Sequence, residues 1–65
     1  MRTESAPAIE RRPQVELRTG LSRSAIYAAM AKGEFPKPVR LTAKAVGWRS
    51  TDVDAWIESR REASA

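Results

Sequence analysis

The hydrophobic pattern of the chain begins with two short stretches of helical character. Residues 13–19 form the first, and Pro13 suits a first helical position because its missing N–H would be unpaired there in any case. Gly20 is typical of the residue after a helix end, where a left-handed backbone is common. A helix of this length cannot persist in isolation. We therefore expect Val15 to pack inward and hold it in place.

The second stretch predicts a helix over residues 23–32, with Ser22 as its N-cap and Gly33 as its stop. Its apolar residues lie three and four positions apart, which gives one buried stripe made of Ile26, Ala29 and Met30. Only Gly-Leu-Ser separates this helix from the first one. Two short helices joined in this way are typical of a helix-turn-helix motif.

After the second helix the pattern changes to that of a strand pair. Pro36 and Pro38 exclude a helix, because each pushes the residue before it into an extended conformation. Residues 39–41 alternate apolar, basic, apolar, and residues 45–48 supply a plausible return strand. Residues 42–44 form the connection. It lacks the Asn-Gly or Asp-Gly pair of the tightest hairpins, so the turn type stays open.

A third helix is predicted after Ser50, which we assign as its N-cap. One stripe at helical spacing contains Val53, Trp56, Ile57 and Arg60. We expect Trp56 and Ile57 to lie in the core, because they supply much of the apolar area available. The expected fold is mostly α with a small β-hairpin, in the order helix, helix, strand, strand, helix.

The length of the chain sets the domain organisation. Its 65 residues allow one domain, since a chain this short buries roughly 60% of the surface that its unfolded form exposes. Residues 1–12 are polar and are expected to form a disordered N-terminal arm, in which Arg11 and Arg12 have the option of reaching a phosphate backbone. The domain then covers residues 13–62, followed by a frayed C-terminus at 63–65.

The composition excludes most enzyme chemistry. The chain has no Cys and no His, which removes thiolate nucleophiles, Cys-based zinc sites and the usual general base near neutral pH. We therefore expect no catalytic residue, no cofactor and no metal ion. Residues 1–12 also lack the apolar run of a signal peptide, so a cytoplasmic location without membrane contact is expected.

The net charge of +4 is unevenly distributed and points to an anionic partner. Residues 13–49 carry seven basic and two acidic side chains, whereas residues 50–65 carry two basic and four acidic ones. A membrane-binding amphipathic helix would combine its basic residues with an exposed apolar face. Here the best apolar stripe lies on the acidic last helix. The pattern favours double-stranded DNA over a membrane surface.

The second predicted helix carries the main candidate contacts, on the hypothesis that it enters the major groove. Arg23 is the candidate for base readout, because a guanidinium can bond O6 and N7 of guanine together. Ser22 and Ser24 are candidates for phosphate contacts, although Ser22 also reads as a plain cap. Tyr27, one turn after Arg23, has two open readings: a DNA contact or partial burial against the hairpin.

The remaining candidates lie outside this helix or at its end. Arg40 and Lys44 on the hairpin are expected to reach the DNA backbone or minor groove. Lys32 and Arg49 are weaker candidates, since each is also readable as a solvated charge. Trp48 reads better as a core residue than as an intercalating wedge.

Several motifs occur in an order and spacing that resemble one known family. They are Thr19-Gly20-Leu21-Ser22-Arg23-Ser24, Gly33-Glu34-Phe35-Pro36, Gly47-Trp48-Arg49 and Val53-x-x-Trp56-Ile57. Over residues 13–60 the chain resembles the AlpA family of small prophage-encoded transcriptional regulators, which are related to phage excisionases and MerR-type domains. The resemblance implies a winged helix-turn-helix with Arg23, Ser24 and Tyr27 in the major groove and Arg40 and Lys44 on the wing.

The chain departs from the family pattern in two features. Ala28 and Ala29 follow Tyr27, where the family often carries a basic residue, and the expected hairpin tip at 42–44 has no Gly.

The expected function is that of a sequence-specific DNA-binding transcriptional regulator, acting as dimers or several copies on repeated sites. An excisionase-like factor that bends attachment-site DNA stays open as an alternative. A different class is a protein-interaction module, in which an acidic face contacts an integrase or RNA polymerase through Asp52, Asp54, Glu58 and Glu62. RNA binding is disfavoured, because no aromatic platform for single-stranded bases is visible.

Overall fold

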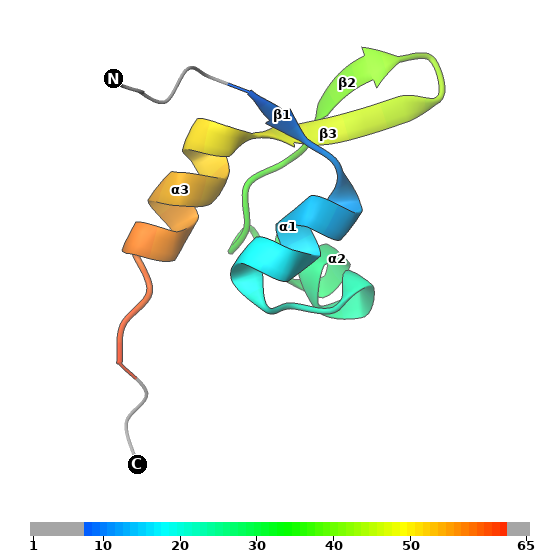
Figure 1. The fold of residues 1–65 in the computed structure, drawn as a ribbon. Coiled ribbons are helices and arrows are strands. Elements are labelled where there is room, and N and C mark those ends of the chain that lie inside the picture. The colour runs from blue at the N-terminus through cyan, green and yellow to red at the C-terminus, as the bar shows by residue number, and fades with distance from the viewer. Residues whose placement is uncertain (1–7, 63–65) are drawn as a thin grey trace, which may run out of the picture.

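Three short helices and a three-stranded sheet make up the chain in a computed structural model that describes residues 8–62 (Figure 1). Their order is β1 (Ile9–Glu10), α1 (Arg12–Thr19), α2 (Arg23–Ala31), β2 (Val39–Thr42), β3 (Ala45–Arg49) and α3 (Ser50–Glu58). The expected fold class, mostly α with a small β-hairpin in a winged helix-turn-helix, is confirmed. Among the described residues, no helix is long and apolar enough to cross a membrane.

The helix-turn-helix follows the local signals of the sequence. The helix α1 ends at Gly20, whose φ of 76° is left-handed and whose N–H donates to the Glu16 carbonyl oxygen. At the start of α2 the Ser22 hydroxyl accepts a hydrogen bond from the Ala25 N–H at 3.1 Å, as expected of an N-cap. Beyond α2, Gly33 adopts a φ of 74°. These positions confirm the predicted helix ends to within one residue.

The hairpin has a tighter connection than the sequence suggested. The strands β2 and β3 pair antiparallel, with Val39 opposite Gly47 and Arg40 opposite Val46, and a register shift follows Arg40. Two residues, Ala43 and Lys44, form the turn. The Thr42 hydroxyl accepts from the Lys44 N–H at 3.1 Å, so a side chain stabilises a turn that contains no glycine.

The strand β1 is an element that the predicted order lacks. It pairs antiparallel with β3, so the sheet order is β1-β3-β2, with Ile9 opposite Arg49 and Glu10 opposite Trp48. Two residues are too few to show the alternation by which strands are predicted. Residues 8–12, expected in the arm, are thus part of the fold, whereas residues 1–7 of that arm and the expected frayed end at 63–65 lie outside the described part.

The predicted N-cap at Ser50 is wrong. Ser50 is the first residue of α3, and Arg49 occupies the cap position without a side-chain hydrogen bond. Ser50 instead joins the start of β1: its N–H donates to the Ala8 carbonyl oxygen at 2.7 Å, and its hydroxyl accepts from the Ala8 N–H at 3.1 Å. The hydroxyl is therefore used by a distant segment rather than by its own helix.

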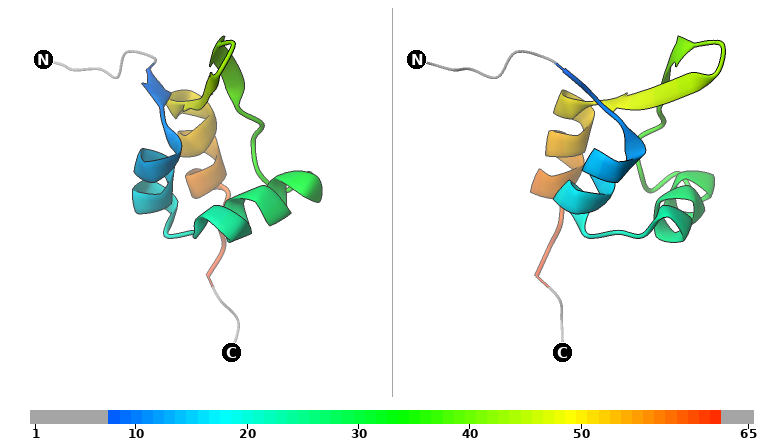
Figure 2. Two further views of the ribbon diagram at one scale, coloured as in Figure 1. Left: turned by 90° about the vertical axis from the view of Figure 1, so that its right-hand side faces the viewer. Right: turned by 45° about the vertical axis from the view of Figure 1, so that its right-hand side comes forward.

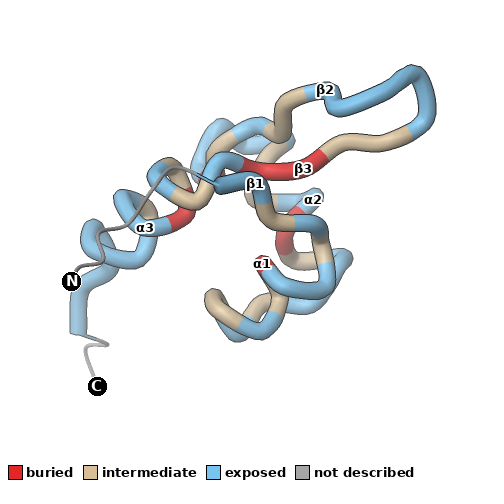
Figure 3. The backbone as a smooth tube through the Cα atoms, turned by 45° about the horizontal axis from the view of Figure 1, so that its top comes forward, coloured by how far each residue is buried: buried red, intermediate tan, exposed pale blue. Residues whose placement is uncertain are grey.

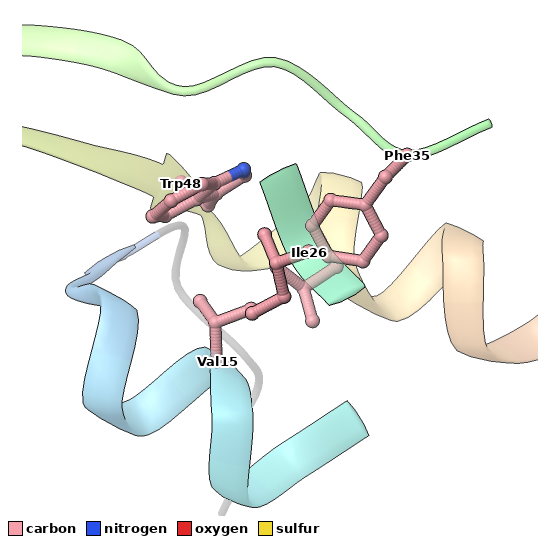
Figure 4. Close-up of a cluster of buried hydrophobic side chains, with 5 residues drawn as sticks. Val15, Ile26, Phe35 and Trp48 are labelled. Carbon is pink, nitrogen blue, oxygen red and sulfur yellow. The ribbon is translucent and has the colours of Figure 1, made fainter. Parts of the chain in front are cut away.

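The core gathers one or two side chains from each helix and from β3. Its buried members are Val15, Ile26, Phe35, Trp48 and Val53, and Figure 4 shows the side chains of four of them turned toward one another. Figure 3 locates the buried segments on the sides of the helices and β3 that meet in the middle. The expectation that Trp48 is a core residue rather than a wedge is confirmed, because its side chain has 0% exposure.

The predicted stripe of the last helix is only partly buried. Trp56 packs against the edge of the core, and the centre of its ring lies 5.0 Å from the centre of the Phe35 ring. Ile57, in contrast, keeps 37% exposure. The expectation that Ile57 is a core residue is therefore wrong. Phe35 takes the place beside Trp56, because the α2–β2 connection folds back over α3. No periodic pattern around Phe35 predicts its burial.

Candidate nucleic-acid interface

One face of α2 is buried and the opposite face is polar and exposed. Ile26 is fully buried against the core. The exposed face at the beginning of the helix carries Ser22, Arg23, Ser24 and Tyr27, and Tyr27 keeps 40% exposure. The four candidate residues of this helix start therefore lie together at the surface, where their side chains are available to a partner.

Arg23 and Tyr27 form a pair within this face. The guanidinium carbon of Arg23 lies 5.6 Å from the centre of the Tyr27 ring, one helical turn away. A cation over an aromatic face gains roughly 0.5–1 kcal/mol at an exposed site. Tyr27 therefore holds the Arg23 side chain along the helix, which reduces the conformational freedom that Arg23 would lose on binding a ligand.

The two hairpin candidates lie at the far end of the sheet from α3. Arg40 is exposed and donates to the Ala43 carbonyl oxygen at 3.2 Å, which holds its side chain near the turn. Because Arg40 is directly opposite Val46, both side chains point to the same face of the hairpin. Trp48 shares that face, since side chains two positions apart lie on one side of a strand. Arg40 thus points to the side on which the helices pack.

The helix α2 and the β2–β3 hairpin project on the same side of the molecule, and α3 lies on the opposite side (Figures 1 and 2). The structure therefore brings the exposed start of α2 and the hairpin cations to one side. Two guanidiniums, an ammonium, two hydroxyls and a phenol on one surface form a set of hydrogen-bond donors suited to a polyanion.

Lys32 and Arg49 are not part of this group. Lys32 is the C-cap of α2 and lies about 13 Å along the helix from Arg23, at 1.5 Å per residue. Arg49 lies opposite Ile9 on the sheet face that turns away from the helices. The side chain of Gly47, if it had one, would meet Ile9 and Leu41 on that same face.

Arg18 is used inside the fold. Its guanidinium pairs with Glu10 at 3.1 Å and with Asp54, so it joins β1 and α3 to α1. Its side chain keeps only 24% exposure. The basic excess that the sequence assigns to residues 13–49 therefore includes one cation that acidic side chains neutralise.

The sequence analysis placed two arginines that border the same side in a disordered arm, with phosphate contact only as an option. Arg11 and Arg12, which we expected in the arm, line a hollow together with Tyr27 of α2 and Val46 of β3. The basic pair immediately before Pro13 was the signal in the sequence, but only the turn from β1 into α1 brings it beside α2.

Comparison with known proteins gives one family and two relatives. The sequence model of the family described as "Prophage CP4-57 regulatory protein (AlpA)" matches residues 8–61. The chain is 35% identical over 66 residues to the "DNA-binding transcriptional activator AlpA" of Escherichia coli (strain K12), covering 92% of this chain and 94% of that protein.

A second relative comes from a bacteriophage. It is the "Uncharacterized protein ORF88" of Enterobacteria phage P4, 48% identical over 48 residues. The match covers 74% of this chain but 54% of the phage protein, so the chain spans about half the length of that relative.

Proposed function

This chain belongs to the AlpA family of prophage regulatory proteins, and from that membership we propose that it is a sequence-specific regulator of transcription that binds double-stranded DNA. The E. coli relative is named a DNA-binding transcriptional activator, and the two chains align over nearly their whole lengths. On this proposal the protein acts in the cytoplasm and catalyses no reaction.

The observation that carries the proposal is that α2 and the β2–β3 hairpin project on the same side of the molecule. An α-helix has a diameter of about 10–12 Å with its side chains, which fits the major groove of B-DNA at about 12 Å wide. With the exposed start of α2 in that groove, the hairpin is available to the neighbouring backbone as a wing. Support also comes from charge, because no acidic residue occurs between Ser22 and Gly33.

Each candidate residue has a role in this proposal. Arg23, held by Tyr27, bonds a guanine edge, and the Ser22 and Ser24 hydroxyls donate to phosphates. Ser22 can serve both purposes, because its oxygen accepts from Ala25 while its O–H stays a donor. Arg40 and Lys44 contact the backbone from the wing. To Lys32 and Arg49 we assign only a long-range electrostatic attraction to DNA that does not depend on its sequence.

The position of α3 supports a second contact, to protein. This helix lies on the side opposite α2 and the hairpin (Figure 1), and its exposed acidic residues include Glu58. We propose that this face is free to meet an integrase or RNA polymerase while the other side holds DNA. One module of this size has a footprint of only about 600–1,000 Å², so we expect dimers or several copies on repeated sites.

Footprinting on the DNA that flanks the protein's own gene tests the proposal. We expect protection of a defined site with repeats, and an affinity that falls steeply with salt because counterions are released from phosphates. Bending of the protected DNA, combined with altered excision and unaltered transcription, would favour the excisionase-like alternative. Absence of binding to any duplex at low salt would overturn the proposal.

A further inference from the structure

A hollow opens between the start of α1, the exposed face of α2 and the helix-facing side of β3. Its volume is about 390 Å³, and its lining consists of Arg11, Arg12, Pro13, Tyr27, Val46 and Trp48. The two arginines are the charged members of this lining, and no carboxylate belongs to it. The hollow is therefore a positively charged site with apolar walls.

We propose that this hollow seats one phosphodiester group of the DNA backbone, held by Arg11 and Arg12. The inference rests on the proposed DNA-binding function and extends it, because it adds a third contact region beside the recognition helix and the wing. It also includes two residues from the segment that sequence reasoning left in an arm.

The backbone fold fixes both arginines at the edge of the hollow. Arg11 lies between β1 and α1 in an extended conformation, with φ −85° and ψ 167°, and its carbonyl oxygen accepts from the Val15 N–H at 3.1 Å. Pairing of Glu10 with Trp48 ties the preceding residue to β3. Arg11 is thus anchored on both sides, while its side chain is exposed.

Arg12 keeps donors for a ligand although it is paired. Its Nε donates to Glu16 at 2.8 Å, and its side chain retains 39% exposure. A guanidinium has five N–H donors in a planar fork, so one bond through Nε leaves the terminal nitrogens for a second anion. The same pairing restricts the side chain, which lowers the entropy that binding costs.

The walls of the hollow strengthen an interaction with an anion. Val46 and Pro13 give it apolar walls with a low dielectric constant, and charges interact more strongly next to such walls than in open water. The phenol of Tyr27 is a further donor at the edge. A phosphodiester oxygen is a negatively charged hydrogen-bond acceptor, and the lining of the hollow contains no such group.

The hollow also has the position that a backbone strand requires. Tyr27 belongs both to its lining and to the exposed face of α2, where Arg23 lies over the ring. Val46 belongs to the hairpin and is directly opposite Arg40. A DNA strand that leaves the groove occupied by α2 and runs to the wing passes between these two points, and the hollow lies there.

The test compares Arg11→Gln with Arg61→Gln, which removes the same charge from an exposed residue after α3, at the far end of the chain. Dissociation constants are measured by fluorescence anisotropy over a series of salt concentrations, with both a protected duplex and a random one. We expect Arg11→Gln to reduce the slope of log K against log salt by about 0.9, the value for one lost phosphate contact. The loss should be similar on both duplexes, and Arg61→Gln should leave the slope unchanged. Equal slopes for the two variants would overturn the phosphate seat while leaving DNA binding intact.

A chemical substitution in the DNA locates the contact. Single phosphates of the duplex are replaced one at a time by neutral methylphosphonates. At one position the wild type should lose affinity, and Arg11→Gln and Arg12→Gln should lose no more there, because the partner charge is already missing. Losses that simply add at every position would contradict the proposal. A wild type that binds no duplex would remove the underlying function as well, which separates the two failures.

Discussion

The indole Nε1 of Trp48 donates a hydrogen bond to the carbonyl oxygen of Pro36 at 2.9 Å. Trp48 lies fully buried in β3, and Pro36 lies in the connection between α2 and β2. The bond therefore fixes the connection against the sheet and, with it, the position of the hairpin relative to α2. Together with the packing of Phe35 in the core, this contact holds the α2–β2 connection, which joins the two elements that we propose to contact DNA.

Replacement of Trp48 by Phe removes this donor and leaves a partly buried carbonyl oxygen unpaired. We expect the free energy of unfolding to fall by about 2–4 kcal/mol, from the unpaired acceptor and the smaller ring together. Urea denaturation measures the loss. Trp56→Phe is the matched control, because the Trp56 indole donates to an exposed carbonyl of Glu34 that water can reach. Equal losses in the two variants would contradict the role of the Pro36 contact.

Gly47 allows β1 to lie against β3. A Cβ at this position would lie 2.5 Å from Cγ2 of Ile9 and 3.0 Å from the Glu10 carbonyl oxygen. We expect Gly47→Ala to destabilise the protein by about 1–3 kcal/mol, because the strand must move. Thermal melting checks this. In an Ile9→Ala background the cost should be smaller but not zero, since the backbone oxygen stays, and full additivity would disagree with the steric cause.

We expect Arg18 to stabilise the fold through its ion pairs with Glu10 and Asp54 and to make no contact in the proposed complex with DNA. Within residues 8–62, Oε1 of Glu10 is buried without a hydrogen-bond partner, and Arg18 binds the other carboxylate oxygen. Arg18→Gln should cost about 1–3 kcal/mol, because it leaves a largely buried carboxylate uncompensated. Asp54→Asn should cost less, since the Asp54 side chain keeps 55% exposure. The salt slope of DNA binding should stay unchanged in Arg18→Gln, and a reduced slope would assign Arg18 to the interface.

Ser22 and Ser24 differ in their structural role although both are exposed hydroxyls at the start of α2. Ser22→Ala removes the cap on the Ala25 N–H and should destabilise the protein by about 0.5–2 kcal/mol. Ser24 is the second residue of α2 and does not cap it, so Ser24→Ala should change stability little. Chemical denaturation of both variants checks the difference. If both hydroxyls bond phosphates, both variants should also weaken DNA binding, and an effect of neither on affinity would remove the serines from the interface.

Arg23 and Lys44 are expected to contribute to binding in different ways. Arg23→Ala should lower affinity for the protected site by about 1–3 kcal/mol and relax preference at one base pair. Lys44→Ala, at the hairpin turn, should weaken binding to all duplexes and reduce the salt slope. Competition assays with single-base variants of the site measure the first effect. Identical losses on specific and random DNA from both variants would contradict base readout by Arg23.

The arrangement of Arg23 over Tyr27 adds a control for the same experiment. Tyr27→Phe keeps an aromatic face for the guanidinium but removes the phenol. If Tyr27 acts by holding Arg23, this variant should keep the base preference, whereas Tyr27→Ala should relax it. A loss of preference in Tyr27→Phe equal to that in Tyr27→Ala would show that the hydroxyl itself is read.

The sequence by itself determined the helix-turn-helix and the charge distribution along the chain. Gly20, Ser22 and Gly33 act through the backbone of their immediate neighbours, so their effect is visible in the local sequence. The same holds for the exposed face at the start of α2, because helical spacing separates it from Ile26. Membership in the AlpA family follows from the same ordered motifs.

The tertiary structure alone decided which distant residues meet. The strand β1 exists because Gly47 leaves room for Ile9, and the Ser50 hydroxyl is taken by Ala8 rather than by its own helix. Ile57 stays exposed, because Phe35 from the α2–β2 connection fills the space beside Trp56. Each of these outcomes depends on a partner at least twenty positions away, which periodicity and propensity do not register. Arg11 and Arg12, which were expected in the arm, line a hollow for the same reason, because the pairing of β1 with β3 brings them beside α2.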